Sequence, residues 1–153
     1  MEGTEKRIRD VVTAAPPLVV GPRELVANVV SAMTAQGVQA ALVASTGGLV
    51  GIFTERDYLV RVVATGRSGS RTMVGAVMTA EPDTLCLDDE VGYAINRMAI
   101  RGYRNVPIVD DAGQPIALVG VHDVVEHLTE IFDDAPAPGD DAMYADWLDI
   151  GGG

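Results

Sequence analysis

Apolar residues recur at helical spacing in two separate stretches of the chain. They fall three and four positions apart over 26–33 and again over 91–98, so that each stretch presents one apolar face. A glycine follows each stretch, at Gly37 and at Gly102, where a helix is expected to end. The pattern predicts two helices that occupy equivalent places in two halves of the chain.

Shorter apolar runs flank each predicted helix and indicate strands. Val19-Val20 and Leu85–Leu87 precede the helices. Two longer runs joined by turn residues follow each helix, which is typical of a β-hairpin; these runs are 40–44 with 49–53, and 106–109 with 116–119. A last helix is predicted from about 56 to 64 and from about 123 to 132. Each half therefore has the predicted order β-α-β-β-α.

Comparison of the chain with itself supports a duplication. Thr13, Ala14 and Pro16 match Thr79, Ala80 and Pro82 at a separation of 66 positions. Arg56-Asp57 matches His122-Asp123 at the same separation. We therefore predict one repeat at 8–65, a Gly/Ser linker at 66–73, a second repeat at 74–132 and an acidic tail at 133–153.

A single unit of this size cannot bury the face of its own sheet. Two units packed sheet to sheet can, which makes the duplicated chain one α/β domain.

The charge of the chain excludes some partners. The formal net charge is −11, and the segment 133–153 contains six Asp and no Lys or Arg. A body and a tail of the same negative sign repel nucleic acid and anionic membranes, so we expect neither as a partner. Cys86 is the only cysteine, and we expect it to be buried and inert in its apolar run. With no signal-peptide pattern at the start, the sequence predicts a cytoplasmic protein.

Three motifs in order resemble those of the CBS domains, the repeats named after cystathionine β-synthase. Gly51-Ile-Phe-Thr-Glu-Arg-Asp57 resembles their strand-to-helix signature. Arg104-Asn-Val-Pro-Ile-Val-Asp110 resembles their proline-containing strand, and Val77-Met-Thr-Ala-Glu-Pro82 the segment that opens a repeat. The resemblance covers about 8–130. It implies tandem CBS repeats with pseudo-two-fold symmetry, called a Bateman module, that associate as homodimers.

The resemblance also implies a ligand. Such pairs have two clefts between the repeats that commonly take AMP, ADP, ATP, S-adenosylmethionine or a related adenosine compound. Asp57 can accept hydrogen bonds from both ribose hydroxyls, and Thr54 can donate to phosphate together with the free N–H groups of a helix start. In the alternative interpretation, Thr54 caps the helix, and the negative charge of Asp57 only interacts favourably with the positive end of the helix dipole.

The remaining candidate contacts come from the second repeat. Thr79 with Pro82, and the strand Val106-Pro107-Ile108, are expected to meet the base. Arg104 is placed to meet phosphate, or else is a solvated surface side chain. Asp123 would be the ribose-binding residue of the other cleft. The position of Thr54 is Gly120 there, so we expect unequal clefts.

Other chemistry finds little support in the sequence. His122 and His127 are five apart, which places them on different faces of a helix, so we expect surface histidines and no metal site. No catalytic constellation is recognisable, and no cofactor is required. The tail has apolar residues at near-helical spacing over 143–150, which indicates a docking helix or a disordered solubilising tail.

Together with the patterns, the resemblance implies a non-catalytic regulatory module that senses an adenosine-containing ligand and acts on an unidentified protein partner. One alternative is a dimerisation or interaction module that has lost ligand binding. Another is an accessory subunit of an enzyme.

Overall fold

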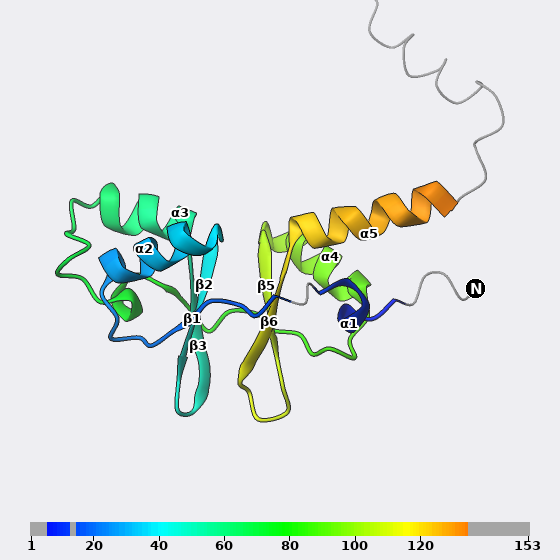
Figure 1. The fold of residues 1–153 in the computed structure, drawn as a ribbon, viewed down its shortest axis with the longest axis horizontal. Helices are drawn as coiled ribbons and strands as arrows, with labels where there is room; N and C mark the ends of the chain where they lie inside the picture. The colour runs from blue at the N-terminus through cyan, green and yellow to red at the C-terminus, as the bar shows by residue number, and fades with distance from the viewer. Residues whose placement is uncertain (1–5, 13–14, 135–153) are drawn as a thin grey trace, which may run out of the picture.

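The computed structural model describes residues 6–12 and 15–134, which form two similar halves side by side (Figure 1). The first half of the sequence comprises α1 (Ile8–Val11), β1 (Val19–Val20), α2 (Val26–Gln36), β2 (Ala40–Ser45), β3 (Gly48–Thr54), α3 (Glu55–Asp57) and the π-helical segment η1 (Tyr58–Val63). The second half of the sequence comprises the 3₁₀ turn η2 (Val74–Ala76), β4 (Thr79–Ala80), α4 (Val91–Arg101), β5 (Asn105–Val109), β6 (Pro115–Gly120) and α5 (Val121–Asp134). In space, α1 packs on the other half beside α4 and α5 (Figure 1), where Ile8 is buried in the core. Conversely, η2 and β4 lie with the first half (Figure 1).

The two sheets are unequal because the second half lends a strand to the first. The larger sheet has the order β1-β2-β3-β4, with β1 parallel to β2 and the other pairs antiparallel. Its edge strand β4 opens the second half and pairs Thr79 with Ile52 and Ala80 with Gly51. The smaller sheet is the hairpin β5-β6. The strand predicted at 85–87 is reduced to a single bridge between Leu85 and Ile108.

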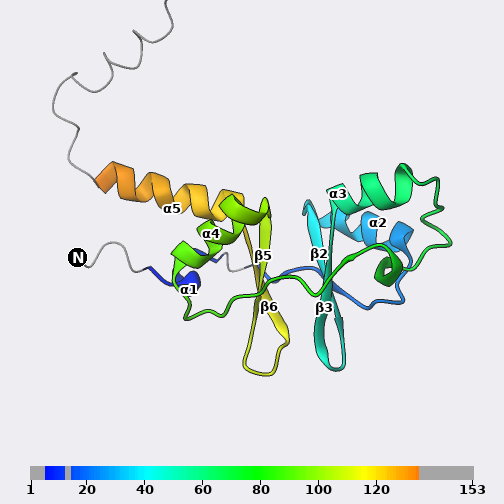
Figure 2. The ribbon, with the colours of Figure 1, turned by 180° about the vertical axis from the view of Figure 1, so that it is seen from behind.

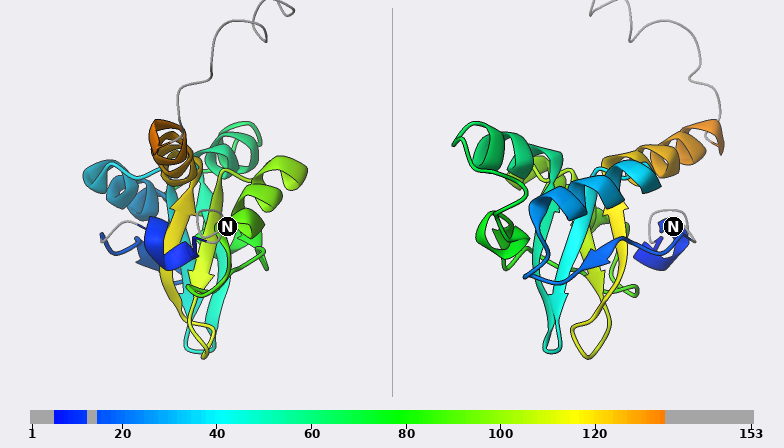
Figure 3. Two further views of the ribbon diagram at one scale, coloured as in Figure 1. Left: turned by 90° about the vertical axis from the view of Figure 1, so that its right-hand side faces the viewer. Right: turned by 60° about the vertical axis from the view of Figure 1, so that its left-hand side comes forward.

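The sheets face one another, as expected for a duplicated unit. Leu118 of β6 packs against a buried cluster formed by Ala40, Leu42 and Ile52 of the first half. Two further cores lie between helices and sheet, one with Phe53 and one with Ile108. The halves exchange residues in them: Val74 and Val77 are buried with Phe53, and Ile8 is buried with Ile108. The helices α2, α3 and α5 lie toward one end of the strands (Figure 3).

The hairpin tips meet at the opposite end of the strands from the helices (Figure 2). Leu49 N–H donates to the carbonyl oxygen of Gly113 over 3.0 Å. Gly48 has a φ of 116°, and a Cβ there would lie 2.7 Å from that same oxygen. The absence of a side chain at position 48 therefore permits the contact.

The predicted helix ends are confirmed by backbone geometry. Gly37 and Gly102 follow α2 and α4 in the left-handed conformation, with φ of 66° and 70°. Both glycines donate their N–H to carbonyls of the last helical turn. The last helices of the halves differ, because the first half continues from α3 into a π-helical segment whereas α5 is α-helical throughout.

Two predictions about single side chains are wrong. Cys86 is exposed, because the segment around it does not join the sheet as a strand and lies at the surface. His127 is only 7% exposed, whereas His122 is a surface residue that pairs with Glu126 at 3.2 Å. Five positions along a helix rotate the second histidine by roughly 140°, which turns it toward the interior.

None of the helices within 6–12 and 15–134 has the length and apolar character needed to cross a membrane.

Candidate ligand-binding cleft between the two halves

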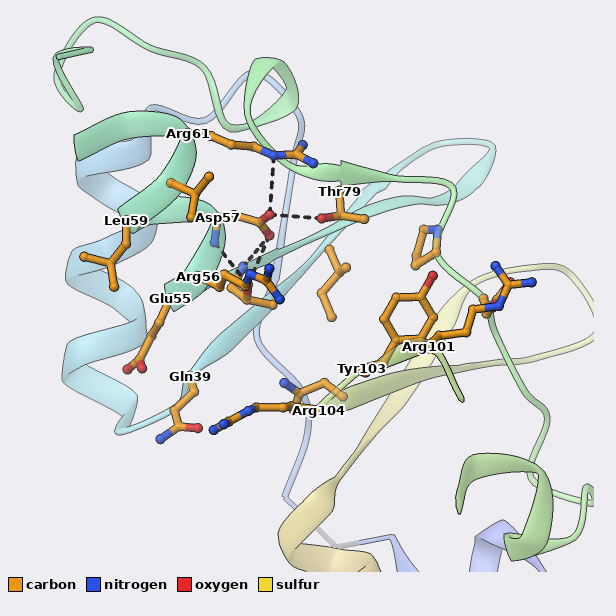
Figure 4. Close-up of a pocket in the computed structure, with 17 residues that line it drawn as sticks. Gln39, Glu55, Arg56, Asp57, Leu59, Arg61, Thr79, Arg101, Tyr103 and Arg104 are labelled. Atoms are coloured by element: carbon orange, nitrogen blue, oxygen red, sulfur yellow. Dashed lines mark hydrogen bonds and ion pairs between the residues drawn. The ribbon is translucent and has the colours of Figure 1, made fainter. Parts of the chain in front are cut away.

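A cavity of about 660 Å³ lies where the two halves meet. The first half contributes the end of β3 and the helical turns that follow it, from Thr54 to Arg61. The second half contributes the turn after β4, with Pro82 and Asp83, and the connection between α4 and β5, from Arg101 to Asn105. Figure 4 shows these side chains converging from both halves on one space.

The Asp57 carboxylate is the most enclosed charged group on the cavity wall. The residue is 7% exposed. Its Oδ2 accepts hydrogen bonds from Thr54 N–H at 3.0 Å and from the Thr54 hydroxyl at 3.1 Å. Its Oδ1 accepts from the Thr79 hydroxyl at 3.0 Å and lies 3.8 Å from Arg61 Nε. Donors from both halves thus fix the orientation of the carboxylate.

The capping interpretation of this pair describes real contacts. Asp57 N–H donates to the Thr54 hydroxyl at 3.3 Å, which completes a capping box at the start of α3. The Thr54 hydroxyl therefore both donates to and accepts from the same residue. It is engaged with Asp57 here, and is not turned toward a phosphate as the resemblance implies. Asp57 nevertheless lines the cavity, so capping and ligand contact are compatible.

The acceptor capacity of Asp57 is not exhausted. An ionised carboxylate has about four lone-pair sites, and three conventional hydrogen bonds occupy this one. Arg61 approaches Oδ1 only at ion-pair distance and makes its own hydrogen bond, at 2.6 Å, to the carbonyl oxygen of Met78. A hydroxyl entering from the cavity can therefore still donate to the carboxylate.

Four arginines surround the cavity: Arg56 and Arg61 from the first half, and Arg101 and Arg104 from the second. Three acidic residues also line it: Glu55, Asp57 and Asp83. This wall is therefore basic on balance in a chain whose net charge is −11. Such a wall suits an anion that binds between the halves.

The arginines differ in how they are held. Arg61 is fixed by Asp57 and Met78, and Arg101 lies 3.5 Å from Asp83. Arg56 and Arg104 have no side-chain hydrogen bond or ion pair with any other residue in the described ranges. Arg104 extends across the cavity toward Gln39 (Figure 4). Two guanidinium groups are thus available for an incoming ligand.

The turn that brings Pro82 and Asp83 to the cavity has an unusual backbone. Glu81 has a φ of 49°, in the left-handed region that a residue with a side chain seldom adopts, and it directly precedes a proline. Its N–H donates to the carbonyl oxygen of Val50 over 3.1 Å, which anchors the turn to β3. Backbone of this kind is often found at binding sites.

The structure brings five of the predicted residues together: Thr54, Asp57, Thr79, Pro82 and Arg104. Val106, Pro107 and Ile108 do not line the cavity, because β5 is buried on both faces and only the residues before it reach the opening. Asp123 lies apart from this cavity and accepts a 2.7 Å hydrogen bond from Gly120 N–H, in the manner of Asp57 and Thr54. Thr13 and the segment 143–150 lie outside the described residues.

Sequence reasoning did not select Arg101, Tyr103 or Asp83. The first two belong to the run Arg101-Gly-Tyr-Arg104, which begins at the last residue of α4, and this grouping of basic and aromatic residues was a usable signal. No pattern in the sequence pointed to Asp83, because its ion pairs are formed with arginines of α4 that are distant in the sequence. Arg97 Nε and Arg101 Nε approach its Oδ2 at 3.8 and 3.5 Å.

Comparison with protein families gives two matches to the CBS domain, over residues 8–64 and 74–130. Among curated proteins, the chain is 36% identical over 118 residues to the CBS domain-containing protein CBSX3, mitochondrial, of Arabidopsis thaliana, covering 71% of this chain and 57% of that protein. It is 33% identical over 126 residues to the meiotically up-regulated gene 70 protein of Schizosaccharomyces pombe, covering 78% and 17%. The chain thus spans less than two thirds of either relative.

Solved structures share the arrangement. The CBS domain protein NE2398 superposes with a TM-score of 0.72 at 26% identity, covering 81% of this chain and 98% of that one. The CBS domain pair of protein MJ0100, crystallised with 5′-methylthioadenosine and S-adenosyl-L-methionine, superposes with a TM-score of 0.73 at 19% identity, covering 82% and 98%. The latter likeness concerns the fold.

Proposed function

The chain belongs to the CBS-domain family as a tandem regulatory pair, and on this premise we propose that its central cleft binds an adenosine nucleotide through both ribose and phosphate. It does so without catalysing a reaction, and it reports the bound state to a protein partner. The observation that carries this proposal is the buried Asp57 carboxylate facing a cavity that four arginines surround.

Each part of the ligand has a matching group. One ribose hydroxyl donates to Asp57, which retains about one of its four acceptor sites. The phosphates lie toward Arg56 and Arg104, whose guanidinium groups are without partners among residues 6–12 and 15–134. Tyr103 lies near Arg101 and across from Thr79 (Figure 4), where its ring can stack on a base.

The charge of the cavity favours a particular ligand class. The related pair of protein MJ0100 was crystallised with S-adenosyl-L-methionine, which carries a sulfonium cation. Four arginines against three carboxylates favour an anion instead. We therefore expect the order of affinity to be ATP or ADP, then AMP, then S-adenosylmethionine and 5′-methylthioadenosine.

Ligand binding would change the relative arrangement of the two halves, because the ligand contacts both of them. Arg56 belongs to the first half and Arg104 to the second, so a phosphate between them stabilises one relative arrangement of the two. We propose that this arrangement is sensed at the exposed apolar side of the helices, where another protein chain would bind. This side includes Leu59, Val63, Ile100 and Val125. A homodimer formed through this surface would bury these side chains.

The other cleft is expected to be weaker. Gly120 stands where the first repeat has Thr54, and Asp123 does not line the cavity described above. We therefore expect one strong site for each chain.

Calorimetric titration tests the proposal. Purified protein is titrated with ATP, ADP, AMP, S-adenosylmethionine and 5′-methylthioadenosine, with and without Mg²⁺. One strong site for each chain, with affinity rising with phosphate number, supports it. No heat with any of the five, or tighter binding of S-adenosylmethionine than of ATP, contradicts it.

A dimerisation module without a ligand is the second candidate. The favouring observation is that Thr54 and Asp57 already satisfy one another within the capping box. In that case, Asp57→Ala alters stability but not the response of the protein to any nucleotide.

A further inference from the structure

A second cavity lies on the outer side of the first half, between α2 and the helical segment α3–η1. It has a volume of about 520 Å³ and is lined mainly by apolar side chains, among them Val30, Met33, Val38, Phe53 and Tyr58. We call it the α2–η1 groove. Glu55 is the one charged residue in its lining. The groove thus suits an apolar surface and not a phosphate.

The groove borders a π-helical segment and shares a wall with the ligand cleft. Tyr58 and Leu59, at the start of η1, both line it. π-helical turns occur frequently at functional sites. Gln39, Glu55 and Leu59 line the groove on one side and the cleft on the other. A change of conformation in this wall therefore affects both cavities.

The chain itself contains a segment with the complementary pattern. On a helical wheel of 100° per residue, Met143, Tyr144, Trp147, Leu148 and Ile150 fall within one arc of about 160°. Asp146 and Asp149 fall on the opposite side. The apolar arc can enter a groove while both aspartates remain in solvent. Apolar anchors arranged in this way are typical of a helix bound in a groove.

The length of the intervening chain indicates which copy supplies the segment. α5 leads away from the first half (Figures 1 and 2) and has 14 residues, so it spans about 21 Å. A return to the groove must retrace that length, cross two sheets packed about 10 Å apart, and reach a helix layer about 10 Å thick beyond them, which makes roughly 40 Å. The eight residues 135–142 extend to at most about 29 Å. This reach is too short within one chain, whereas the groove of a second copy has no such constraint.

We propose that the α2–η1 groove binds the amphipathic segment 143–150 of a second copy of this chain. Because Gln39, Glu55 and Leu59 belong to both cavities, occupation of the groove and occupation of the cleft influence one another. The groove itself needs no nucleotide, so the docking stands or falls independently of the proposed function.

Trp147 is the only tryptophan of the chain, so its fluorescence reports the environment of the segment directly. The full-length protein is measured without nucleotide over a dilution series. Docking predicts a blue-shifted emission with low acrylamide quenching at high concentration. Dilution shifts the emission to the red and raises the quenching several-fold.

Two variants tie this signal to the groove. Thr34→Glu places a carboxylate in the groove lining and is expected to give red-shifted emission at every concentration. Ser31→Glu, on the same helix but outside the lining, is the matched control and keeps the emission of the unaltered chain. Leu148→Asp changes the segment instead of the groove and should reproduce the effect of Thr34→Glu with an unchanged circular dichroism spectrum.

Three outcomes overturn the proposal. The first is solvent-exposed emission from the unaltered chain at all concentrations. The second is a blue-shifted emission that Thr34→Glu leaves unchanged, which places the segment elsewhere. The third is a blue-shifted emission that does not depend on concentration, which excludes a second copy as its source.

Discussion

The Thr79 hydroxyl donates a 3.0 Å hydrogen bond to Asp57 Oδ1, and this bond joins the opening strand of the second repeat to the carboxylate of the first. The acceptor is 7% exposed, and Thr79 lies on β4, the strand that the second half adds to the first sheet. The orientation of the proposed ribose-binding group therefore depends on both repeats.

Replacing Thr79 with valine tests this dependence on stability. The side chain keeps its shape but loses the hydroxyl that donates to a buried carboxylate, so we expect the free energy of unfolding to fall by about 1–2 kcal/mol. Urea denaturation followed by circular dichroism measures the change. Thr84→Val, at an exposed threonine, is the control and should stay within about 0.5 kcal/mol of the unaltered chain. Equal effects of the two changes would contradict the interpretation.

Asp57→Asn and Asp123→Asn separate ligand contact from helix capping. Each carboxylate accepts a hydrogen bond from the backbone N–H three residues before it, so both changes disturb a helix start. Only Asp57 lines the described cavity. We expect Asp57→Asn to weaken ATP binding by roughly tenfold or more, because a charge-assisted hydrogen bond is lost. Asp123→Asn should leave the strong site within about twofold by calorimetry.

Arg104→Gln tests the phosphate contact. The change removes a guanidinium group that has no partner among the described residues, so we expect little effect on stability. Affinity for ATP should fall by about tenfold, whereas affinity for adenosine, which has no phosphate, should stay the same. Arg23→Gln, at an exposed arginine outside the cavity, is the matched control. A parallel loss of ATP and adenosine binding would indicate a general distortion of the cleft.

Gly48→Ala tests the contact between the hairpin tips. The new Cβ would lie 2.7 Å from the Gly113 carbonyl oxygen, and the φ of 116° is unfavourable for alanine. We expect a loss of about 1–3 kcal/mol in the free energy of unfolding. Gly47→Ala serves as the neighbouring control, because its nearest contact, Ser45 Oγ, is 4.0 Å away. A stable Gly48→Ala protein would show that the tips separate at little cost.

Ile100→Asp tests the proposed dimer. Ile100 is 74% exposed on α4, so a charge there should not disturb the core of the monomer. We expect sedimentation to shift toward the monomer, since a carboxylate would be buried in the interface. Ile116→Asp, on β6, is the control and should sediment as the unaltered chain does. An unchanged mass for Ile100→Asp would place the interface elsewhere.

The repeated fold could be predicted from the sequence because the patterns that indicate its helices and strands are local. Helical spacing, glycines at helix ends and hairpin turn residues act over a few positions, and Gly37 and Gly102 end their helices as predicted. The pairing of β4 with β3 was not predicted. Two residues, Thr79 and Ala80, carry too short a pattern to identify a strand, and their partner lies in the other repeat.

The candidate site could be predicted only in part, because only some of its residues belong to one local motif. Thr54 and Asp57 stand three positions apart in one motif, and the structure places them on the cavity wall as a pair. Arg101 and Tyr103 reach the cavity because the connection from α4 to β5 lies on its wall. Their grouping in the sequence indicates the residue types but not this position in space. Val106 to Ile108 matched a family motif but lie inside the sheet, because a resemblance does not show which face of a strand is accessible. The ligand contacts of these residues stay predictions.

The position of β4 restricts where this protein can be truncated without losing part of the first sheet. Cleavage or genetic truncation in the segment 66–73 would follow the sequence boundary, yet it would remove the edge strand of the remaining sheet and the hydroxyl that holds Asp57. A fragment intended to represent the first repeat must therefore run through Ala80. The unit of duplication and the stretch that completes the first sheet are different parts of this polypeptide.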